Sequence, residues 1–392
     1  MSNIAIIGGG ASGLIAAIFA AQNGHAVTIL ERMNRVGKKI LATGNGRCNI
    51  TNQNINKEAY HGTHKEDMMG AFSLFSLQDT IDFFENLGII MTEEENGKMF
   101  PLSLQASSVL DNLRYECERL GVLEECSFDV TNIKRQKNGF LVSDSKGENH
   151  YFDRVILAAG GRASSALGSN GSGYTLAKMM GHTIVPSFAA LCKIYVEEDF
   201  VRAIAGVKFM GEITVEGCDS SARDEILFTE NGISGPAVFS VSRTISQKMH
   251  ENKPVSVLLD MFPDIPKNEL FRILYTRMEA MPYKTIAENL IGFLHKKLIL
   301  TVLRSAEIDK NMLSSHMTKS QISSLCRILK EWKFEVSKVA SFNDSQVCAG
   351  GVLTREVDPF TMQSKKCPGL YITGELLDID GDCGGFNLQW AW

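Results

Sequence analysis

Residues 3–31 carry two apolar runs separated by a cluster of glycines and a helix-like segment. The stretch NIAIIGGG ends in glycines, Ser12 to Asn23 is rich in Ala, Leu and Ile, and AVTILE follows after Gly24. Short continuous apolar runs are typical of buried parallel strands, and the segment between them has the composition of a helix that a glycine ends. The pattern therefore predicts a βαβ unit.

Three glycines of this unit match the spacing G-x-G-x-x-G between a strand and a helix: Gly8, Gly10 and Gly13. The first allows a tight turn, the second lets the backbone approach a pyrophosphate, and the third lets helix and strand pack closely. The helix N-terminus offers free N–H groups to phosphates. Glu31 ends the second strand, where its carboxylate is placed to accept hydrogen bonds from an adenosine ribose and disfavours NADP. Dinucleotide binding is therefore predicted.

The next segment, RVGKKILATGNGRCNITN (35–52), is rich in Gly, Asn and basic residues. Gly44 and Gly46 permit backbone conformations that allow close approach to a ligand. Lys38, Lys39 and Arg47 add positive charge. We therefore expect a loop that contacts the cofactor, although a solvated surface loop has a similar composition.

The middle of the chain changes character twice. Residues 65–120 are mostly helical in pattern, and YFDRVILAAGG then predicts another strand of the parallel sheet, with a glycine turn at Gly160 and Gly161 facing the ligand. From about 188 to 263 the segments are short, β-branched and interrupted by turns, which predicts a small antiparallel sheet or barrel. Residues 264–338 have a helical pattern.

Composition and charge restrict the class of protein. With 44% hydrophobic and 22% charged residues, the 392-residue chain has the composition of a globular enzyme. No basic residue precedes the N-terminal apolar run, and glycines interrupt it, so we expect neither a leader nor a membrane span, and a soluble cytoplasmic protein. The nine cysteines lack zinc-site spacing, which predicts reduced thiols and no metal site.

The overall net charge of −5 hides an uneven distribution. Residues 264–338 hold 13 Lys or Arg and 8 Asp or Glu, a net charge of +5, which leaves −10 for the rest of the chain. A solvated lysine-rich helix face explains this excess without any function. The alternative is a docking surface for an acidic partner such as RNA.

Glycine-rich segments return after residue 345. GLYITGE predicts a strand that ends beside Gly374 and Glu375, and GGFNLQWAW predicts a glycine loop that opens a final helix. An NAD-binding domain is usually one contiguous block, whereas FAD domains of this type receive their flavin-binding half from the end of the chain. The sequence holds no second strand–G-x-G-x-x-G–helix unit. FAD is therefore the expected cofactor.

Together these segments resemble the YhiN/BaiN family of flavoproteins, and the resemblance extends over essentially the whole chain. It rests on GNGRCNITN, FPLSLQASSV, ILAAGG, LFTENGISGPA, CAGGV, TMQSK and GELLDIDGDCGGFNLQWAW. The sequence departs from the family at Glu230, where His is common, and at Gln363, where Glu is common. The family's last helix runs on beyond the position of Trp392, so we expect a shortened C-terminus.

The resemblance implies an α/β fold with a glutathione-reductase-type FAD-binding Rossmann domain. This domain would comprise residues 1–187 and 345–392. A β-rich, barrel-like domain would be inserted at 188–263 and completed by 339–344, and it would itself carry a helical insertion at 264–338.

The resemblance and the motifs also assign residues to parts of the cofactor. The pyrophosphate would contact Gly8, Gly10, Ala11, Ser12 and Gly13, and the adenosine would contact Glu31, Arg32 and Val130. Lys38, Lys39, Gly46, Arg47 and Cys48 would lie along the phosphates and flavin, and Ala159, Gly160 and Gly161 would form the glycine turn that faces the cofactor. The ribityl chain would contact Gly374, Glu375 and Asp378, and the flavin ring would contact Gly385, Phe386, Asn387 and Leu388.

The expected chemistry is hydride transfer by bound FAD, with NAD(P)H as the transient donor and an unsaturated substrate or oxygen as the acceptor. The start of the final helix would stabilise negative charge on the reduced ring, with Asn387 beside it. Cys48 is the first candidate for a proton donor, because Arg47 and loop N–H groups would lower its pKa. A packed thiol is the alternative. Cys383 is a second candidate.

Two other residues with reactive side chains are expected to be structural: Cys348, which replaces a small residue, and His182, which follows a helix end.

The resemblance leaves three substrates open: aminoacetone in an amine oxidation, a bile-acid intermediate, and a uridine in ribosomal RNA. The basic helical segment favours the RNA. A small-molecule oxidase or reductase and a flavin-dependent sensor without fast turnover are the alternatives.

Overall fold

The computed structural model describes residues 1–392. The chain forms two compact units. The first comprises Met1–Ala189 and Phe342–Trp392, and the second comprises Ala190–Ser341. The first unit thus takes both ends of the chain, and the second is a single continuous stretch.

A five-stranded parallel sheet is the centre of the first unit. Its order is β20-β11-β1-β2-β7, and every neighbouring pair runs parallel. The strands span Asn3–Ile7 (β1), Ala26–Glu31 (β2), Leu123–Cys126 (β7), Arg154–Leu157 (β11) and Leu370–Ile372 (β20). The predicted βαβ unit is present, with helix α1 at Ala11–Gln22 between β1 and β2.

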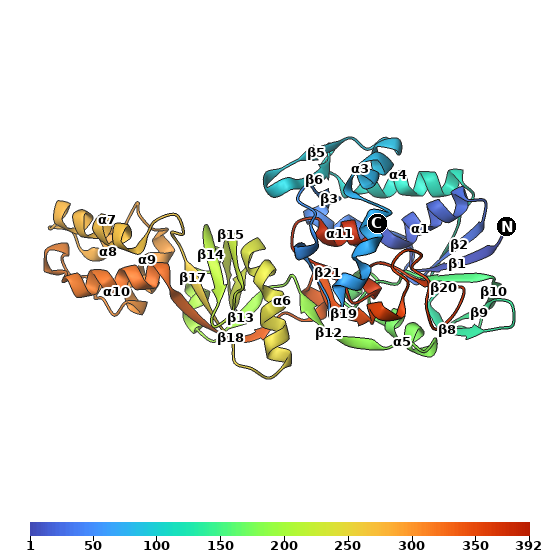
Figure 1. Ribbon diagram of the computed structural model, residues 1–392. Helices are drawn as coiled ribbons and strands as arrows, with labels where there is room; N and C mark the ends of the chain where they lie inside the picture. The colour runs from blue at the N-terminus through green and yellow to red at the C-terminus, as the bar shows by residue number, and fades with distance from the viewer. The chain divides into compact units, whose positions relative to one another are not determined.

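Both faces of this sheet are buried, which explains the continuous apolar runs. Successive residues of a strand point to opposite faces, so Ile4 and Ile6 join one hydrophobic cluster while Ala5 and Ile7 join another. Helices α1 and α4 (Ala106–Arg119) supply the first cluster. The second cluster includes residues of the three-stranded sheet formed within residues 130–152, which lies on the opposite side of the parallel sheet from α1 and α4 in Figure 1.

The remaining elements of the first unit are shorter. The three-stranded sheet consists of Val130–Arg135 (β8), Phe140–Asp144 (β9) and Asn149–Phe152 (β10). The other strands are Thr51–Asn52 (β3), Tyr60–His61 (β4), Met91–Glu93 (β5), Lys98–Pro101 (β6), Ile184–Ala190 (β12), Val347–Val352 (β19) and Asp380–Gly381 (β21). The other helices are Lys38–Ala42 (α2), Leu77–Asn86 (α3), Ser172–Met179 (α5) and Phe386–Ala391 (α11).

The prediction of a mostly helical segment at 65–120 was incomplete. Strands β5 and β6 lie within it, and β6 pairs with β5 on one side and with β3 on the other in a three-stranded sheet. These strands are three and four residues long, too short for an alternating pattern to stand out.

The second unit contains the barrel that the sequence predicted. It is closed, in the order β13-β16-β15-β14-β17-β18. The strands span Ile194–Val196 (β13), Lys208–Val215 (β14), Ser221–Thr229 (β15), Gly232–Ser234 (β16), Ser256–Asp260 (β17) and Trp332–Val339 (β18). Helix α6 (Pro236–His250) packs its apolar stripe into the barrel core and was not predicted.

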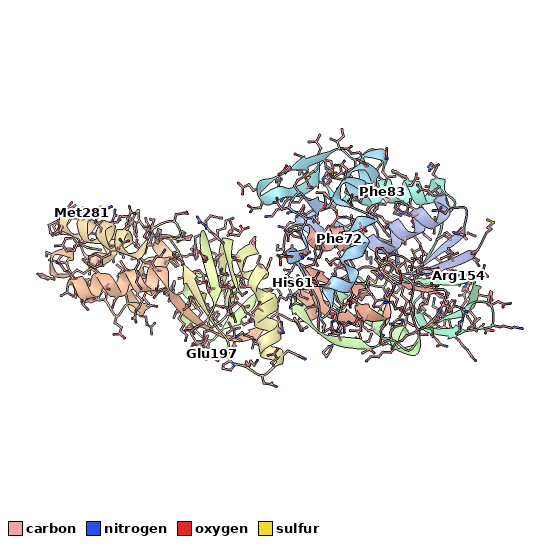
Figure 2. The ribbon with its side chains drawn as sticks, viewed as in Figure 1. His61, Phe72, Phe83, Arg154, Glu197 and Met281 are labelled. Atoms are coloured by element: carbon pink, nitrogen blue, oxygen red, sulfur yellow. The ribbon has the colours of Figure 1, made fainter.

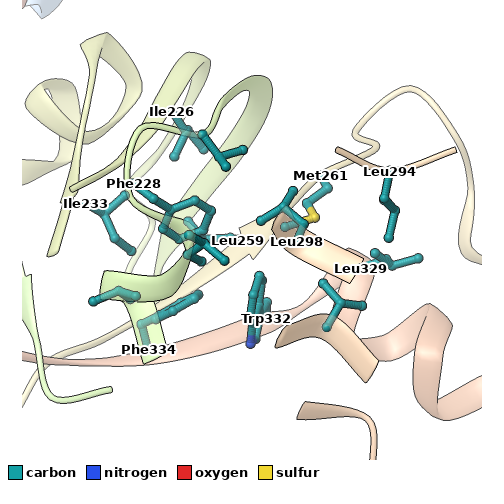
Figure 3. Packing of buried hydrophobic residues seen from close by; sticks show 14 of the residues in the cluster. Ile226, Phe228, Ile233, Leu259, Met261, Leu294, Leu298, Leu329, Trp332 and Phe334 are labelled. Carbon is teal, nitrogen blue, oxygen red and sulfur yellow. The ribbon is translucent and has the colours of Figure 1, made fainter. Parts of the chain in front are cut away.

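Four helices lie between β17 and β18 in the chain. They span Lys267–Ala280 (α7), Ile286–Asn289 (α8), Lys296–Ser305 (α9) and Lys319–Lys330 (α10). Their apolar faces share one continuous core with the barrel: Leu298 of α9 and Leu329 of α10 belong to the same cluster as Phe228 and Phe334 (Figure 3).

Strand β18 corrects the expected limits of the helical insertion. The interval 264–338 contains this strand, so the chain re-enters the barrel at Trp332 and not at 339–344. Trp332, Phe334 and Val336 are buried with charged residues between them, which is the alternation of a half-buried strand.

None of the helices combines the length and apolar character needed to cross a lipid bilayer.

We predict that Phe334→Ala strongly destabilises the second unit. Phe334 is fully buried and packs against Trp332 and Phe228, so the substitution leaves a cavity and lowers the free energy of unfolding by about 3–5 kcal/mol. Urea unfolding followed by circular dichroism measures the loss. Tyr283→Ala, at a side chain 73% exposed, is the matched control and should change it little. Equal stability of the two variants would contradict the assignment of Phe334 to the core.

Candidate nucleotide-binding site

Two of the three fingerprint glycines are required by the packing of the protein itself. Gly8 has a φ of +105°, and a Cβ there would lie 2.6 Å from the backbone oxygen of Ala158. A Cβ on Gly13 would lie 1.9 Å from the backbone oxygen of Gly8. These positions therefore make the turn and the close helix–strand contact that the motif predicts.

Gly10 is different, because no protein contact explains it. Its φ is −85°, which other residues adopt readily, and a Cβ would meet nothing within 4 Å. Gly10 is also the N-cap of α1, and no side chain caps this helix. The free N–H groups of the first helical turn, at Ala11 and Ser12, therefore border an open space that suits a phosphate.

Glu31 is held firmly at the end of β2. It is 8% exposed, and its two carboxylate oxygens accept hydrogen bonds from the backbone N–H groups of Gly9 and Met33, each at 2.8 Å. The next residue, Arg32, donates to the backbone oxygen of Gly168 at 3.4 Å and lies 3.5 Å from Asp129. The carboxylate of Glu31 and the guanidinium of Arg32 thus lie at the end of β2, beside Gly9 and Gly168.

The buried Val130, predicted to meet the adenine, begins β8 two residues after Phe128, whose N–H donates to the backbone oxygen of Glu31. The structure therefore brings Val130 to the same end of β2 as Glu31 and Arg32.

The end of the chain meets the beginning at this edge of the sheet. The Lys39 ammonium lies 2.7 Å from the Glu375 carboxylate, and the other oxygen of Glu375 accepts from the backbone N–H of Cys348 at 3.0 Å. A Cβ on Gly374, whose φ is +67°, would lie 2.7 Å from the hydroxyl oxygen of Ser12. Residues far apart in sequence therefore form one surface.

The glycine turn after β11 joins the same surface. Gly160 has a φ of +67°, and a Cβ there would lie 3.7 Å from a carboxylate oxygen of Glu375. A Cβ on Gly161 would lie 3.4 Å from the carboxyl carbon of Glu375. Ala159 precedes them and lines the turn of Gly8. Gly160 and Gly161 thus lie beside Glu375, while Ala159 lies against Gly8.

The loop after α2 gives Arg47 and Cys48 different surroundings. The Arg47 guanidinium pairs with Glu94 at 2.8 Å and lies 4.3 Å from the centre of the Phe100 ring. Cys48 is fully buried, and burial raises the pKa of its thiol to about 12. The expected lowering of this pKa is therefore wrong: the thiol belongs to the hydrophobic cluster under α1 and is a packing group.

The other residues predicted for this loop have less specific surroundings. Gly46 has a φ of +83° and a nearly open Cβ position, with the backbone oxygen of Leu41 3.9 Å away. The half-buried Lys38 begins α2, next to Lys39.

The last helix is anchored on the loop at 49–52. A Cβ on Gly385 would lie 2.4 Å from the backbone oxygen of Thr51. Asn387 accepts from the N–H of Gly381 at 2.8 Å and donates to its oxygen at 2.7 Å. The side-chain amide of Asn387 therefore fixes the conformation of the loop that precedes the helix. Phe386 is buried, and the partly buried Leu388 packs against the cluster under α1.

Asn49 is a site residue that the sequence reasoning missed. Its side-chain oxygen is buried without a hydrogen-bond partner, and it lies 3.0 Å from the Cβ position of Gly385. Buried polar atoms in folded proteins are usually satisfied, so this oxygen points to a ligand with a donor group. The motif GNGRCNITN contains it, but no local pattern separates its role from those of its neighbours.

His61 and Asp382 form a second pair that the sequence did not reveal, with His61 Nε2 2.7 Å from Asp382 Oδ1 (Figure 2 labels His61). Strand β4 brings them together by pairing with β21. Nearby, the buried Asp378 accepts a hydrogen bond from the Thr63 N–H at 2.9 Å. These residues are more than 300 positions apart in sequence, so only the fold reveals the contact.

The remaining reactive side chains have structural surroundings. His182 is buried, with its ring nitrogens 2.7 Å from the Ser364 hydroxyl and 3.2 Å from Glu356. Cys348 is buried beside Tyr174. Cys383 is partly buried in the loop before the last helix, and none of the nine cysteines forms a disulfide.

Taken together, these residues fit a dinucleotide bound by both the N-terminal and the C-terminal part of the chain. The open space at Gly10 accepts a phosphate, the carboxylate of Glu31 offers an acceptor at the end of β2, and the orphaned oxygen of Asn49 faces the C-terminal segment. A fold with this sheet order, glycine turn and helix N-terminus defines a Rossmann-type nucleotide-binding protein.

Comparisons with known proteins identify the family of this chain. The family model described as "HI0933-like protein Rossmann domain" matches residues 2–392, and the chain belongs to this family. It is 42% identical to the 3-dehydro-bile acid delta(4,6)-reductase of Clostridium scindens, over 100% of this chain and 97% of that protein. It is 30% identical to the ribosomal RNA dihydrouridine synthase of Escherichia coli, over 99% of this chain and 94% of that protein. The predicted family and fold class are thereby confirmed.

We predict opposite effects for two substitutions in the fingerprint. Gly10→Ala should lower the free energy of unfolding by no more than about 1 kcal/mol, the cost of Ala at an N-cap, because its Cβ position is open. It should weaken FAD binding on the order of tenfold or more, about 1.4 kcal/mol. Gly13→Ala should instead destabilise the fold, because its Cβ would collide with Gly8. Urea unfolding and titration of flavin fluorescence measure both. Wild-type affinity in Gly10→Ala would contradict the phosphate assignment.

We predict a pH dependence of stability that comes from His182. Burial lowers its pKa below the ordinary value of 6.5, although Glu356 opposes the shift. As the pH falls, the unfolded chain therefore takes up this proton first. The contribution of His182 to the free energy of unfolding is complete above pH 6.5 and is lost below it.

The matched variants are His182→Gln and His316→Gln, the second at an exposed histidine. Urea unfolding at about pH 7.5 and about pH 5.5 should show a smaller decline for His182→Gln than for the wild type. His316→Gln should keep the wild-type decline. An unchanged slope in His182→Gln would refute the assignment.

Proposed function

We propose that this FAD-dependent oxidoreductase saturates a carbon–carbon double bond conjugated to a carbonyl group in a small, largely apolar substrate. The observation that carries the proposal is the 42% identity, over the full length, to a reductase of a 3-dehydro bile acid. The name of the second relative, a dihydrouridine synthase, describes the same kind of reaction on a pyrimidine ring. Both reactions add a hydride and a proton across an activated double bond.

The chain would hold FAD between its two ends. The N–H groups at the start of α1 would bind the pyrophosphate, with Gly10 leaving room for it. Glu31 would accept from the adenosine ribose through the lone pairs that its two backbone donors leave free. When bound, FAD supplies the hydride chemistry, taking hydride from NAD(P)H and giving it to the substrate carbon.

The Lys39–Glu375 pair would fix the segment that follows β20 next to α2. Its side chains are only 24% and 19% exposed, so the pair is poorly screened by solvent and holds its geometry. Gly374 packs directly on Ser12 and leaves no room for a side chain between the two halves. The chain's own contacts thus set the distance between the two halves of the site.

Saturation of the double bond also needs a proton from a positioned acid. Cys48 does not fit this role, because its thiol is packed in the core. We assign the proton to His61, whose Nε2 lies 2.7 Å from Asp382 Oδ1. The Asp382 carboxylate holds the His61 ring in place. The pair adjoins Gly62, where a Cβ would lie 2.2 Å from the backbone oxygen of Asp378, so it borders the C-terminal half of the site.

A uridine in ribosomal RNA is the second candidate substrate, and the charge of residues 264–338 favours it. Seven of the basic side chains there are exposed and form no ion pair: Lys296, Lys297, Arg304, Lys310, Lys319, Arg327 and Lys338. A polyanion bound by such a surface would dissociate as salt rises. The 30% identity to a ribosomal RNA enzyme agrees with this candidate.

The test is anaerobic reoxidation of the NAD(P)H-reduced protein. Slow bleaching of the flavin by NADH and NADPH would indicate a sensor. After fast bleaching, we expect a 3-oxo-Δ4 steroid to restore the oxidised spectrum quickly, with saturated ketones and amines having no effect. If only ribosomal RNA reoxidises the flavin, and salt weakens this reaction, the substrate is the uridine in ribosomal RNA and not the enone. Reoxidation by neither substrate would overturn the proposed reaction.

The same assay tests His61. His61→Gln should slow reoxidation by the enone about 100-fold or more, while reduction of the flavin by NAD(P)H keeps its wild-type rate. His64→Gln, three residues further along, is the matched control and should behave as the wild type. A wild-type rate of reoxidation in His61→Gln would exclude His61 as the proton donor without affecting the proposed reaction.

A further inference from the structure

A cluster of three metal-ligating side chains lies outside the nucleotide site, where the edges of two sheets meet. Glu125 is on β7, the edge strand of the parallel sheet. Glu148 immediately precedes β10, and His150 is on β10, an edge strand of the three-stranded sheet. All three belong to the first compact unit. The sequence shows no three-ligand spacing here, because Glu125 lies on a different strand, far from Glu148 and His150 in the chain.

The distances between the ligand atoms suit one small cation. His150 Nε2 lies 3.3 Å from Glu148 Oε1 and 3.5 Å from Glu125 Oε1, and the three ligand atoms lie within 4.8 Å of one another. Ligands at about 2.0–2.2 Å from a tetrahedral metal are separated by about 3.3–3.6 Å. The two distances from His150 to the carboxylates already match this spacing.

The histidine is prepared for a ligand. Its Nε2 is buried and has no hydrogen-bond partner. The ring is positioned by Phe128, edge-on with ring centres 5.1 Å apart, and by Phe152 at 6.3 Å. Neither Glu125 nor Glu148 pairs with a lysine or arginine. An orphaned nitrogen thus faces two carboxylates that no other cation neutralises.

We propose that Glu125, Glu148 and His150 bind a divalent first-row transition-metal ion. One imidazole and two carboxylates suit Zn²⁺ or Mn²⁺ better than Ca²⁺ or Mg²⁺, which prefer oxygen ligands alone. Within the first-row series Zn²⁺ binds more tightly than Mn²⁺ to such a set. Three protein ligands leave a fourth position for water.

The bound ion would act as a structural clip. It joins the edge of the parallel sheet to the β9–β10 hairpin, whose inner face carries Phe140 and Val142 into the second cluster of the sheet. Because Glu125 is brought to Glu148 and His150 only by the fold, the unfolded chain does not present the complete site, so metal binding stabilises the folded state. The site is distinct from the proposed flavin chemistry, and its loss should leave reduction of the flavin unchanged.

The experiment uses the full-length protein after treatment with EDTA and removal of the chelator. Calorimetric titration with Zn²⁺ should show one site at this cluster and a rise in melting temperature, and Mg²⁺ should give neither. Glu148→Gln should weaken this site at least about tenfold and abolish the rise. It is a mild change, since the Glu148 side chain is 57% exposed.

Two further variants keep the result unambiguous. His150→Ala should remove the same site, and His316→Ala, at an exposed histidine in the second unit, should titrate as the wild type. Zn²⁺ that binds equally to the wild type and to Glu148→Gln would come from thiols or other histidines and would overturn the proposal. So would a wild-type protein that shows no Zn²⁺ binding and no rise in melting temperature.

Discussion

The contact of Gly374 with α1 and of Glu375 with Lys39 of α2 is the constraint on which the first unit depends. Strand β20 lies next to β11, and β11 lies next to β1, so the C-terminal strand ends at the same edge as the glycine turn. Lys39 then pairs with Glu375, while Gly374 touches Ser12. A poorly exposed ion pair adds little net stability, since desolvation opposes the attraction. Its role is geometric, because it joins Lys39 of the N-terminal part to Glu375 of the C-terminal part.

Much of the first unit was predictable from sequence because its signals are local. The βαβ unit is contained in residues 3–31, and its glycines, apolar runs and terminal acid follow directly from strand and helix geometry. The barrel was also predictable as a class, from short strands at regular spacing. What failed was the end of the helical segment. Trp332, Phe334 and Val336 alternate with charged residues, and this strand pattern was obscured by the amphipathic helix that precedes it.

The site was less predictable, because neighbours in sequence need not share an environment. Arg47 and Cys48 are adjacent, yet the backbone at Cys48 has a φ of +60°. The guanidinium lies over Phe100 while the thiol is buried in the core. The pairs His61–Asp382 and Lys39–Glu375 join residues more than 300 positions apart, and no periodicity or spacing encodes them. Sequence identified the residue types of the site but not their partners.

The last helix illustrates how far the two chain ends depend on each other. Helix α11 is six residues long, and a helix of this length is not stable by itself in water. Its position is set by tertiary bonds: the Gln389 side chain accepts from Thr51 at 2.6 Å and donates to Thr80 at 2.8 Å. The Trp392 indole donates to the backbone oxygen of Ile50 at 2.8 Å.

These partners lie in the N-terminal part of the chain, so residues 50–52 and Thr80 fix where the C-terminal half of the site begins. The orphaned oxygen of Asn49 lies at the same junction. A ligand that satisfied Asn49 would therefore also bind next to the start of α11. The N-terminal segment and the last helix then form a single binding surface, and the glycine at position 385 is required because the backbone of Thr51 passes where a side chain would lie.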